Sequence, residues 1–372
     1  MKICLVTSQH PASGDDYVDR LARGLAENDR VTIVAATAGM PWAPERRMTS
    51  DGVTLLRSAP LTVGRAVAAQ QPDIVHLHRV DEITLGAIFM RVGGRLPIAM
   101  TLHDYALLCT RATLRHGDGR ACKPNFACRQ MAAVNQRLTA SIGLVIGPSH
   151  YALDQHHRRG LFRGALEEVL PVGLEPPSPV LTPTKATYDV VWIGRMEPSS
   201  GVNILIRAFK KLTDRSLRLH LVPMEPAIID SAAEAVSDER IRLYGSGSAI
   251  RQALLEAADC IVAPALWPDS FPVGIQMAFR CGVPVIASRI GGIPEVIRAG
   301  VNGLLVEPGD EGALAATIDE VRRAPELAAG LRAAAVETAR LYDMRFHVGR
   351  LVEAYQRLLT SNRLRPFDRR AA

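Results

Sequence analysis

The chain has 372 residues, enough for two domains of ordinary size, and 48% apolar with 22% charged residues describe a chain that buries a core and is not disordered. The net charge is +6, but aromatic residues make up only 5% and no zinc-finger spacing occurs, so nucleic acid is not an expected partner. No apolar stretch approaches the roughly 18 residues of a membrane-spanning helix and the opening residues do not resemble a signal peptide, so we expect a cytoplasmic protein.

Six short runs rich in Val, Ile and Leu predict strands in the first half of the chain. They cover residues 3–7, 31–36, 53–57, 74–78, 98–102 and 144–147. The segments between them have helical periodicity, as in residues 17–27, where Val18, Leu21, Ala22 and Leu25 share one face. Runs that are apolar throughout are typical of strands covered on both sides in a parallel sheet. Residues 1–170 are therefore expected to form a doubly wound, Rossmann-like α/β domain.

The alternation is interrupted at residues 171–183, which contain five prolines and can continue neither a helix nor a central strand. We expect a linker over residues 171–185. Further strands are expected at residues 190–193, 217–222, 241–244, 260–263, 283–287 and 303–306. Helices are expected at about 201–213, 248–258, 272–281, 311–323 and 326–341. Residues 186–341 then form a second Rossmann-like domain, and ligands of such sheets bind at the carboxyl ends of the strands, here in a cleft between the two domains.

The C-terminal segment 342–372 combines an amphipathic helix over residues 345–359 with a basic tail. Residues 340–372 carry eight arginines against three acidic residues. Such a tail suits contact with an anionic membrane or a phosphorylated substrate, while a solvated arginine face explains the same composition.

The most specific segment is 267–288, WPDSFPVGIQMAFRCGVPVIAS. It predicts a turn after a strand, then a helix capped by Asp269 or Ser270 with Pro272 in its first turn, then another strand. A helix start beside strand ends presents free amides to an anion. From the residues alone, the segment is either an anion site or one more strand–helix–strand unit.

This segment resembles the signature of the family 4, or group 1, glycosyltransferases, which are retaining enzymes of the GT-B fold. Other segments resemble the family in the same order: 1–8 (MKICLVTS) with Gly14, 72–78 (PDIVHLH), 101–105 (TLHDY), 147–149 (GPS), 191–195 (VWIGR), 201–209 (GVNILIRAF), 291–295 (GGIPE) and 302–306 (NGLLV). The resemblance implies two Rossmann-like domains, the first binding an acceptor and the second a nucleoside diphosphate sugar, with the C-terminal helix returning to the first. It also implies transfer to an acceptor hydroxyl without a metal or another cofactor.

The resemblance assigns catalytic roles to three residues. His103 matches the histidine over the transferred sugar, Arg195 the clamp of the donor diphosphate, and Asp269 the acid that binds the donor sugar hydroxyls. The donor-binding positions are Gly14, Ser200, Ser270, Phe271, Pro272, Val273, Met277 and Gly291. Each role has a structural alternative, such as a partly buried histidine, an arginine in a salt bridge or a glycine in an ordinary turn.

The donor half departs from the family pattern at three places. Ser200 stands where the family has a lysine, Met277 where it has a ribose-binding glutamate, and residues 223–226 (PMEP) replace a Gly-x-Gly turn. Losing a preorganised cation and a charge-assisted hydrogen bond weakens binding. One hypothesis is a transferase with an unusual donor, in which Gln276, Arg280 or Ser200 compensates. The alternative is a catalytically impaired homologue that binds or scaffolds an active transferase.

The six cysteines are not expected to form disulfides in a cytoplasmic chain. Cys109, Cys122 and Cys128, together with His116, have the residue types of a zinc site but lack a close Cys-x-x-Cys pair. We interpret this stretch as a local structural or acceptor-binding loop.

Overall fold

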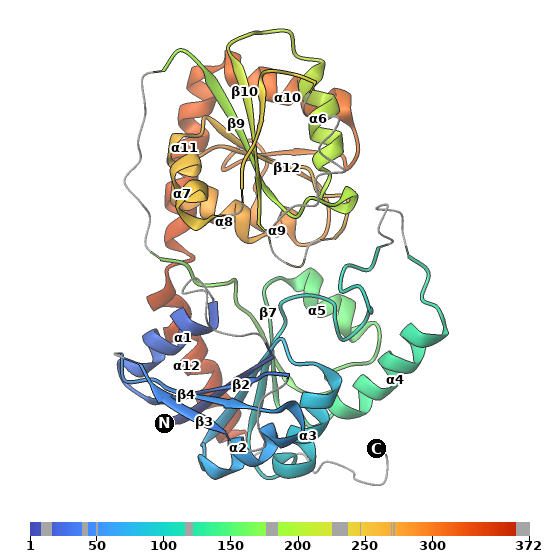
Figure 1. Ribbon diagram of the computed structural model, residues 1–372, viewed down its shortest axis with the longest axis vertical. Coiled ribbons are helices and arrows are strands. Elements are labelled where there is room, and N and C mark those ends of the chain that lie inside the picture. Colours follow the sequence, from blue (N-terminus) through green and yellow to red (C-terminus); the bar gives the residue numbers. More distant parts are fainter. Residues whose placement is uncertain are drawn as a thin grey trace. The chain divides into compact units, whose positions relative to one another are not determined.

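The computed structural model describes residues 1–8, 17–38, 44–49, 51–115, 122–175, 185–224, 237–245, 247–268, 270 and 272–361. The chain divides into two compact units, and Figure 1 labels many of their helices and strands. Unit 1 comprises residues 1–112, 123–173 and the chain from residue 344 onward, and unit 2 comprises residues 113–122 and 174–343. The chain thus passes from unit 1 to unit 2 at Gly173–Leu174, inside the proline-rich segment, most of which lies outside the described residues.

Unit 1 is built on an eight-stranded sheet in the order β3-β4-β2-β1-β5-β6-β7-β8. The strands are β1 (Lys2–Thr7), β2 (Arg30–Ala36), β3 (Glu45–Met48), β4 (Thr54–Ser58), β5 (Ile74–His78), β6 (Ile98–Thr101), β7 (Leu144–Gly147) and β8 (Leu166–Val169). All neighbouring strands pair in parallel except β3, which is antiparallel to β4. The predicted doubly wound parallel sheet is confirmed, but its two edge strands, the fully exposed β3 and the glutamate-containing β8, were not predicted from the apolar runs.

Three of the six helices of unit 1 begin after a residue whose side chain caps a first-turn amide. The helices are α1 (Tyr17–Ala26), α2 (Val63–Ala69), α3 (Glu82–Val92), α4 (Phe126–Thr139), α5 (His150–His157) and α12 (Met344–Thr360), with a short 3-10 turn, η1 (Pro60–Thr62). Asp81, Asn125 and Ser149 accept hydrogen bonds from first-turn amides of α3, α4 and α5, respectively.

The last helix, α12, belongs to unit 1 although it follows all of unit 2 in sequence. It packs against α1 and β7, and Figure 1 shows it beside α1. Glu168 on β8 is only 7% exposed and forms ion pairs with Arg350 and Arg357 of the helix. Because a buried carboxylate needs charged or hydrogen-bonding partners, this contact ties α12 to the edge of the sheet.

Unit 2 contains a six-stranded, fully parallel sheet in the order β11-β10-β9-β12-β13-β14. The strands are β9 (Tyr188–Gly194), β10 (Leu217–Pro223), β11 (Ile241–Leu243), β12 (Cys260–Ala263), β13 (Val285–Ser288) and β14 (Leu304–Val306). The helices are α6 (Val202–Lys210), α7 (Ser248–Ala257), α8 (Val273–Arg280), α9 (Ile293–Val296), α10 (Glu311–Arg323) and α11 (Pro325–Arg340), with the 3-10 turn η2 (Pro198–Ser200). Its core is formed around Trp192 and Phe209, which are almost completely buried. This architecture agrees with the predicted second Rossmann-like domain.

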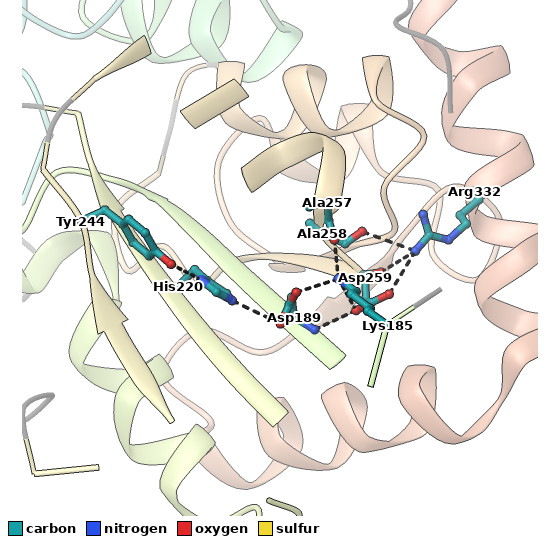
Figure 2. A network of polar contacts seen from close by, with 8 residues as sticks. All are labelled: Lys185, Asp189, His220, Tyr244, Ala257, Ala258, Asp259 and Arg332. Atoms are coloured by element: carbon teal, nitrogen blue, oxygen red, sulfur yellow. Dashed lines mark hydrogen bonds and ion pairs between the residues drawn. The ribbon is translucent and has the colours of Figure 1, made fainter. Parts of the chain in front are cut away.

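A charged network holds the amino ends of β9 and β12 together (Figure 2). Lys185 places its Nζ 2.7 Å from the carboxylate of Asp189 and 2.9 Å from that of Asp259. Arg332 of α11 reaches the Asp259 carbonyl oxygen at 3.3 Å, and His220 Nε2 lies 3.3 Å from the other oxygen of Asp189. Burial raises the pKa of Asp189, but His220 and Lys185 outweigh that effect and lower it well below its usual range. The network lies at the edge of the sheet opposite to the one where ligands bind.

Within the described ranges, no helix is long and apolar enough to cross a membrane.

Candidate functional site

The carboxyl ends of β9 and β12 flank the point in unit 2 where the strand order reverses. From β9 the chain continues to β10 on one side of the sheet and later returns to β12 on the other side. Such a switch point leaves a crevice at the carboxyl edge, which is where ligands of open α/β sheets bind. Arg195 directly follows β9 and therefore lies at this edge.

Arg195 is held in place while remaining accessible to solvent. Its guanidinium carbon lies 6.0 Å from the ring centroid of Trp267, within the range of a cation–π contact. Its Nε lies 3.5 Å from a carboxylate oxygen of Glu197, and its side chain is 47% exposed. Aromatic contact and partial pairing orient the guanidinium without burying it, so its fork of donors can meet an anion.

A single glycine lets α6 start against the end of β12. Gly201 has φ +77°, and a Cβ on this residue would lie 1.7 Å from the carbonyl oxygen of Pro264. Ser200, which precedes it, donates its hydroxyl to the carbonyl oxygen of Glu197 at 2.7 Å. The serine that replaces the family lysine is thus used inside its own turn.

Helix α8 brings its first turn to the same edge, but its start differs from our prediction. A Cβ added to Gly274 would lie 4.0 Å from the carbonyl oxygen of Ile193, at the end of β9. The predicted cap by Asp269 or Ser270 is wrong, because Pro272 occupies the N-cap position, and the side chain of proline has no hydrogen-bond acceptor. Pro272 has ψ 92°, so the chain is still extended at this residue and helical geometry begins only at Val273. Pro272, as the N-cap residue, therefore offers no side-chain acceptor to the first-turn amides of α8.

The other predicted donor-binding residues differ in their burial and backbone conformation. Ser270 and Pro272 are buried, Met277 is half-buried, and Gly291 has φ +62° in the turn before α9. Asp269, Phe271 and Gly14 lie outside the described residues, as does the side chain of Val273. Of the proposed compensating groups, Gln276 is fully buried and Arg280 donates to Gln252 on α7 at 2.7 Å.

In unit 1, His103 lies at the carboxyl edge, two residues after β6. Its Nε2 is 3.1 Å from Nδ1 of His78, the last residue of β5, and its ring centroid is 5.4 Å from that of Tyr17. Burial, followed by the neighbouring His78, lowers the pKa of His103 well below its usual value. His103 is therefore a neutral imidazole at neutral pH, able to donate one hydrogen bond and accept another.

The sequence analysis does not predict which residues contact His103. His76 and His78 alternate with Leu77 on a strand whose residues are all buried, and alternating strand residues share a face. That spacing was the available signal for a histidine pair at one side of the sheet. No comparable pattern in the sequence predicts that residues of α12 pack near His103.

The described residues contain no group of three or more His, Cys, Asp or Glu side chains that could hold a metal ion. Cys109 and Cys128 are buried in unit 1, whereas Cys122 belongs to unit 2. His116 lies outside the described residues.

Family models match both halves of the chain. The glycosyl transferase 4-like domain matches residues 14–173, and glycosyl transferases group 1 matches residues 187–323. The chain belongs to the group 1 glycosyltransferases of the GT-B fold, as its motifs indicate.

Individual relatives agree with this assignment. D-inositol 3-phosphate glycosyltransferase 1 of Catenulispora acidiphila is 26% identical over 398 residues, which cover 96% of this chain and 94% of that protein. A D-inositol 3-phosphate glycosyltransferase of Mycobacterium sp. is 32% identical over 184 residues, which cover 47% of this chain and 40% of that protein.

Solved structures show the same fold. Sucrose-phosphate synthase from Thermosynechococcus elongatus has a TM-score of 0.79 at 18% identity, covering 97% of this chain and 100% of that one. Anabaena HepE, solved in complex with UDP and glucose, has a TM-score of 0.73 at 19% identity, covering 96% and 99%.

Proposed function

We propose that this protein is a retaining glycosyltransferase that moves a sugar from a nucleoside diphosphate sugar to an acceptor hydroxyl. The observation that carries the proposal is the position of Arg195 at the switch point of unit 2, oriented by Trp267 and half-exposed. A planar guanidinium matches the oxygens of a diphosphate, and the first turn of α8, whose N-cap Pro272 has no side-chain acceptor, brings amide donors to the same edge. The solved complex of HepE with UDP and glucose supports the same ligand class.

In the proposed reaction, the bond between the anomeric carbon and the diphosphate oxygen breaks, and the acceptor oxygen bonds to that carbon on the same face. The acceptor proton passes to the departing phosphate. Arg195 and the α8 amides stabilise the charge on the leaving group, and Asp269 and His103 bind the sugar. These groups supply the neutralisation in this chain, so the proposal includes no metal or other resident cofactor.

The test begins with calorimetric titration of the full chain with UDP, GDP, ADP and dTDP, followed by product assays with the corresponding sugars. D-inositol 3-phosphate belongs in the acceptor panel because the relatives are named for it. We expect at least one nucleotide to bind, and Arg195→Ala to weaken its binding at least about tenfold. Arg242→Ala, on the exposed face of edge strand β11, is the matched control and should leave binding unchanged. Absence of both binding and product across the panel refutes the proposal.

The departures from the family pattern provide a second test. Ser200→Lys and Met277→Glu should each tighten donor binding, since each adds a charge-assisted contact of roughly 1.5–3 kcal/mol. Asp269→Ala and His103→Ala should abolish turnover. The alternative of a non-catalytic partner instead expects stable co-purification with another transferase, whose activity would be indifferent to Asp269→Ala.

We further propose that the protein works in the cytoplasm and that the basic segment of residues 340–372, in which Arg350 and Arg357 also pair with Glu168, makes peripheral contact with an anionic membrane. Sedimentation with vesicles of neutral lipid, with and without anionic lipid, measures this contact. Equal sedimentation with both kinds of vesicle contradicts it.

A further inference from the structure

Six aromatic side chains of unit 1 contact one another around the end of β5: Tyr17, His76, His78, His103, His347 and Tyr355. The ring centroids of His76 and His78 lie 4.0 Å apart, and that of Tyr17 lies 5.4–5.7 Å from those of His78, His103 and His347. All except His103 are buried. Two of the six come from α12, so the C-terminal helix completes the surroundings of His103.

His347 and His76 each have hydrogen-bond partners for both ring nitrogens. His347 Nδ1 lies 2.8 Å from the carbonyl oxygen of Pro171, which only accepts, so Nδ1 carries the proton. His347 Nε2 must then accept from the Tyr17 hydroxyl at 2.7 Å. Both ring nitrogens of His76 are also engaged, Nδ1 with the Tyr355 hydroxyl at 2.6 Å and Nε2 with the Thr101 hydroxyl at 2.7 Å.

His78 is different because only one of its ring nitrogens has a hydrogen-bond partner in the part of the chain that the structure describes. Nδ1 lies 3.1 Å from His103 Nε2, whereas Nε2 is buried and has no hydrogen-bond partner among the described residues. Burial lowers the pKa of His78 to about 3, so the ring carries one proton at neutral pH. With the proton on Nε2, a buried N–H would be left without an acceptor, which is rarer in proteins than an unused acceptor. The proton of His78 therefore belongs on Nδ1, where it is donated to His103.

We propose that His78 is a positioning residue that fixes His103 in the tautomer with its proton on Nδ1. His103 Nε2 accepts the hydrogen bond from His78 Nδ1, which leaves the single ring proton of neutral His103 on the other nitrogen. His76, held by Tyr355 and Thr101, packs against His78 and keeps its ring in place.

This inference rests on the proposed function and makes the role of His103 more specific. With Nε2 occupied and its proton on Nδ1, His103 acts toward the sugar or acceptor hydroxyl as a hydrogen-bond donor. It takes no proton in the reaction, because its basic nitrogen faces His78. The acceptor proton then passes to the departing phosphate, and no proton needs to cross the histidine pair.

The first experiment observes the tautomer without relying on turnover. Nitrogen-15 spectra of histidine-labelled full-length protein at pH 7.5 report which ring nitrogen carries the proton, and a His103→Gln sample assigns the signals of His103. We expect a single Nδ1–H tautomer for His103 in the wild type and a mixture of tautomers in His78→Phe. A wild-type His103 with its proton on Nε2 overturns the proposal, even if no substrate is found.

The second experiment separates positioning from folding. His78→Phe keeps the ring volume but removes the hydrogen bond, and we expect kcat to fall at least about tenfold while the Kd for the donor nucleotide stays within about twofold. His78→Asn places an amide near the position of Nδ1 and should recover most of kcat. Equal kcat for His78→Phe and the wild type overturns the proposal, as does loss of donor binding in parallel with kcat. Failure of the wild type to bind or turn over any donor counts against the proposed function instead, and the spectra then decide the tautomer alone.

Discussion

Replacement of His347 by phenylalanine should make the stability of unit 1 less sensitive to acid. His347 lies on α12, is 2% exposed, and has both ring nitrogens hydrogen-bonded. Burial lowers its pKa to about 4, even though the Pro171 carbonyl opposes that shift. The folded protein therefore keeps this ring neutral at pH values where an unfolded chain would protonate it.

The sign and size of the effect follow from this difference. An unfolded histidine has a pKa near 6.5, so below this pH the unfolded state binds a proton that the folded state refuses, and stability falls as the pH drops toward 4. At pH 7.5 the effect is negligible, and at pH 5.0 this one residue costs about 2 kcal/mol. Phenylalanine cannot take up the proton. The free energy of unfolding of the variant is lower by about 1–3 kcal/mol at both pH values, because the Tyr17 hydroxyl and the Pro171 carbonyl lose their hydrogen-bond partner.

Differential scanning calorimetry of the wild type and His347→Phe at pH 7.5 and 5.0 measures this difference. The acid-induced fall in Tm should be smaller in the variant by about 4–8 °C, the change that 2 kcal/mol produces in a unit of this size. His150→Phe is the control, because His150 is exposed in the folded state and its replacement should leave the acid-induced fall unchanged. An equal fall in Tm for His347→Phe and the wild type would show that this ring is not kept neutral by burial.

Three further substitutions test contacts described above. Gly201→Ala should destabilise unit 2 by more than about 3 kcal/mol in thermal unfolding, because the added Cβ would lie 1.7 Å from a backbone oxygen. The control is Gly330→Ala in α11, where an added Cβ has no neighbour within 4 Å. This variant should be neutral or stabilising by up to about 1 kcal/mol. Glu168→Gln removes the charge between its two half-exposed arginine partners and should lower the free energy of unfolding by about 1–3 kcal/mol in urea, an effect that added salt should reduce if the contact is ionic. Lys185→Met removes the cation between Asp189 and Asp259 in unit 2 and should lower the free energy of unfolding by about 2–4 kcal/mol. Unfolding can be monitored by the fluorescence of the buried Trp192, and an unchanged midpoint would mean that the network adds no stability.

The sequence predicts all strands of unit 2 and six of the eight strands of unit 1, because most of their residues are apolar and buried. It does not predict β3 (ERRM) or β8 (LEEV), two edge strands with charged residues, which pair with β4 and β7, respectively. The cap of α8 was wrong because Asp269 and Ser270 are good capping residues by type, and local preference does not show that the chain stays extended through Pro272.

The site shows the same division between local and long-range information. Arg195 and His103 could be found because each follows a recognisable strand in a motif. The surroundings of His103 could not, since the contact between Tyr17 and His347 joins residues 330 positions apart in sequence. The amphipathic pattern of residues 345–359 predicts a packed helix, but it does not show that Tyr355 meets a histidine on β5.

The placement of α12 has a consequence for how the protein is made on the ribosome. Most of unit 1 is synthesised before unit 2, yet His347 and Tyr355 of unit 1 emerge only after all of unit 2 has been translated. Domains usually fold in the order of their synthesis. Here unit 2 is completely synthesised before the last helix of unit 1 has been made. Until helix α12 docks, the nascent unit 1 exposes the surface that α12 covers, so its histidine pair gains its lasting surroundings only after unit 2 has been translated.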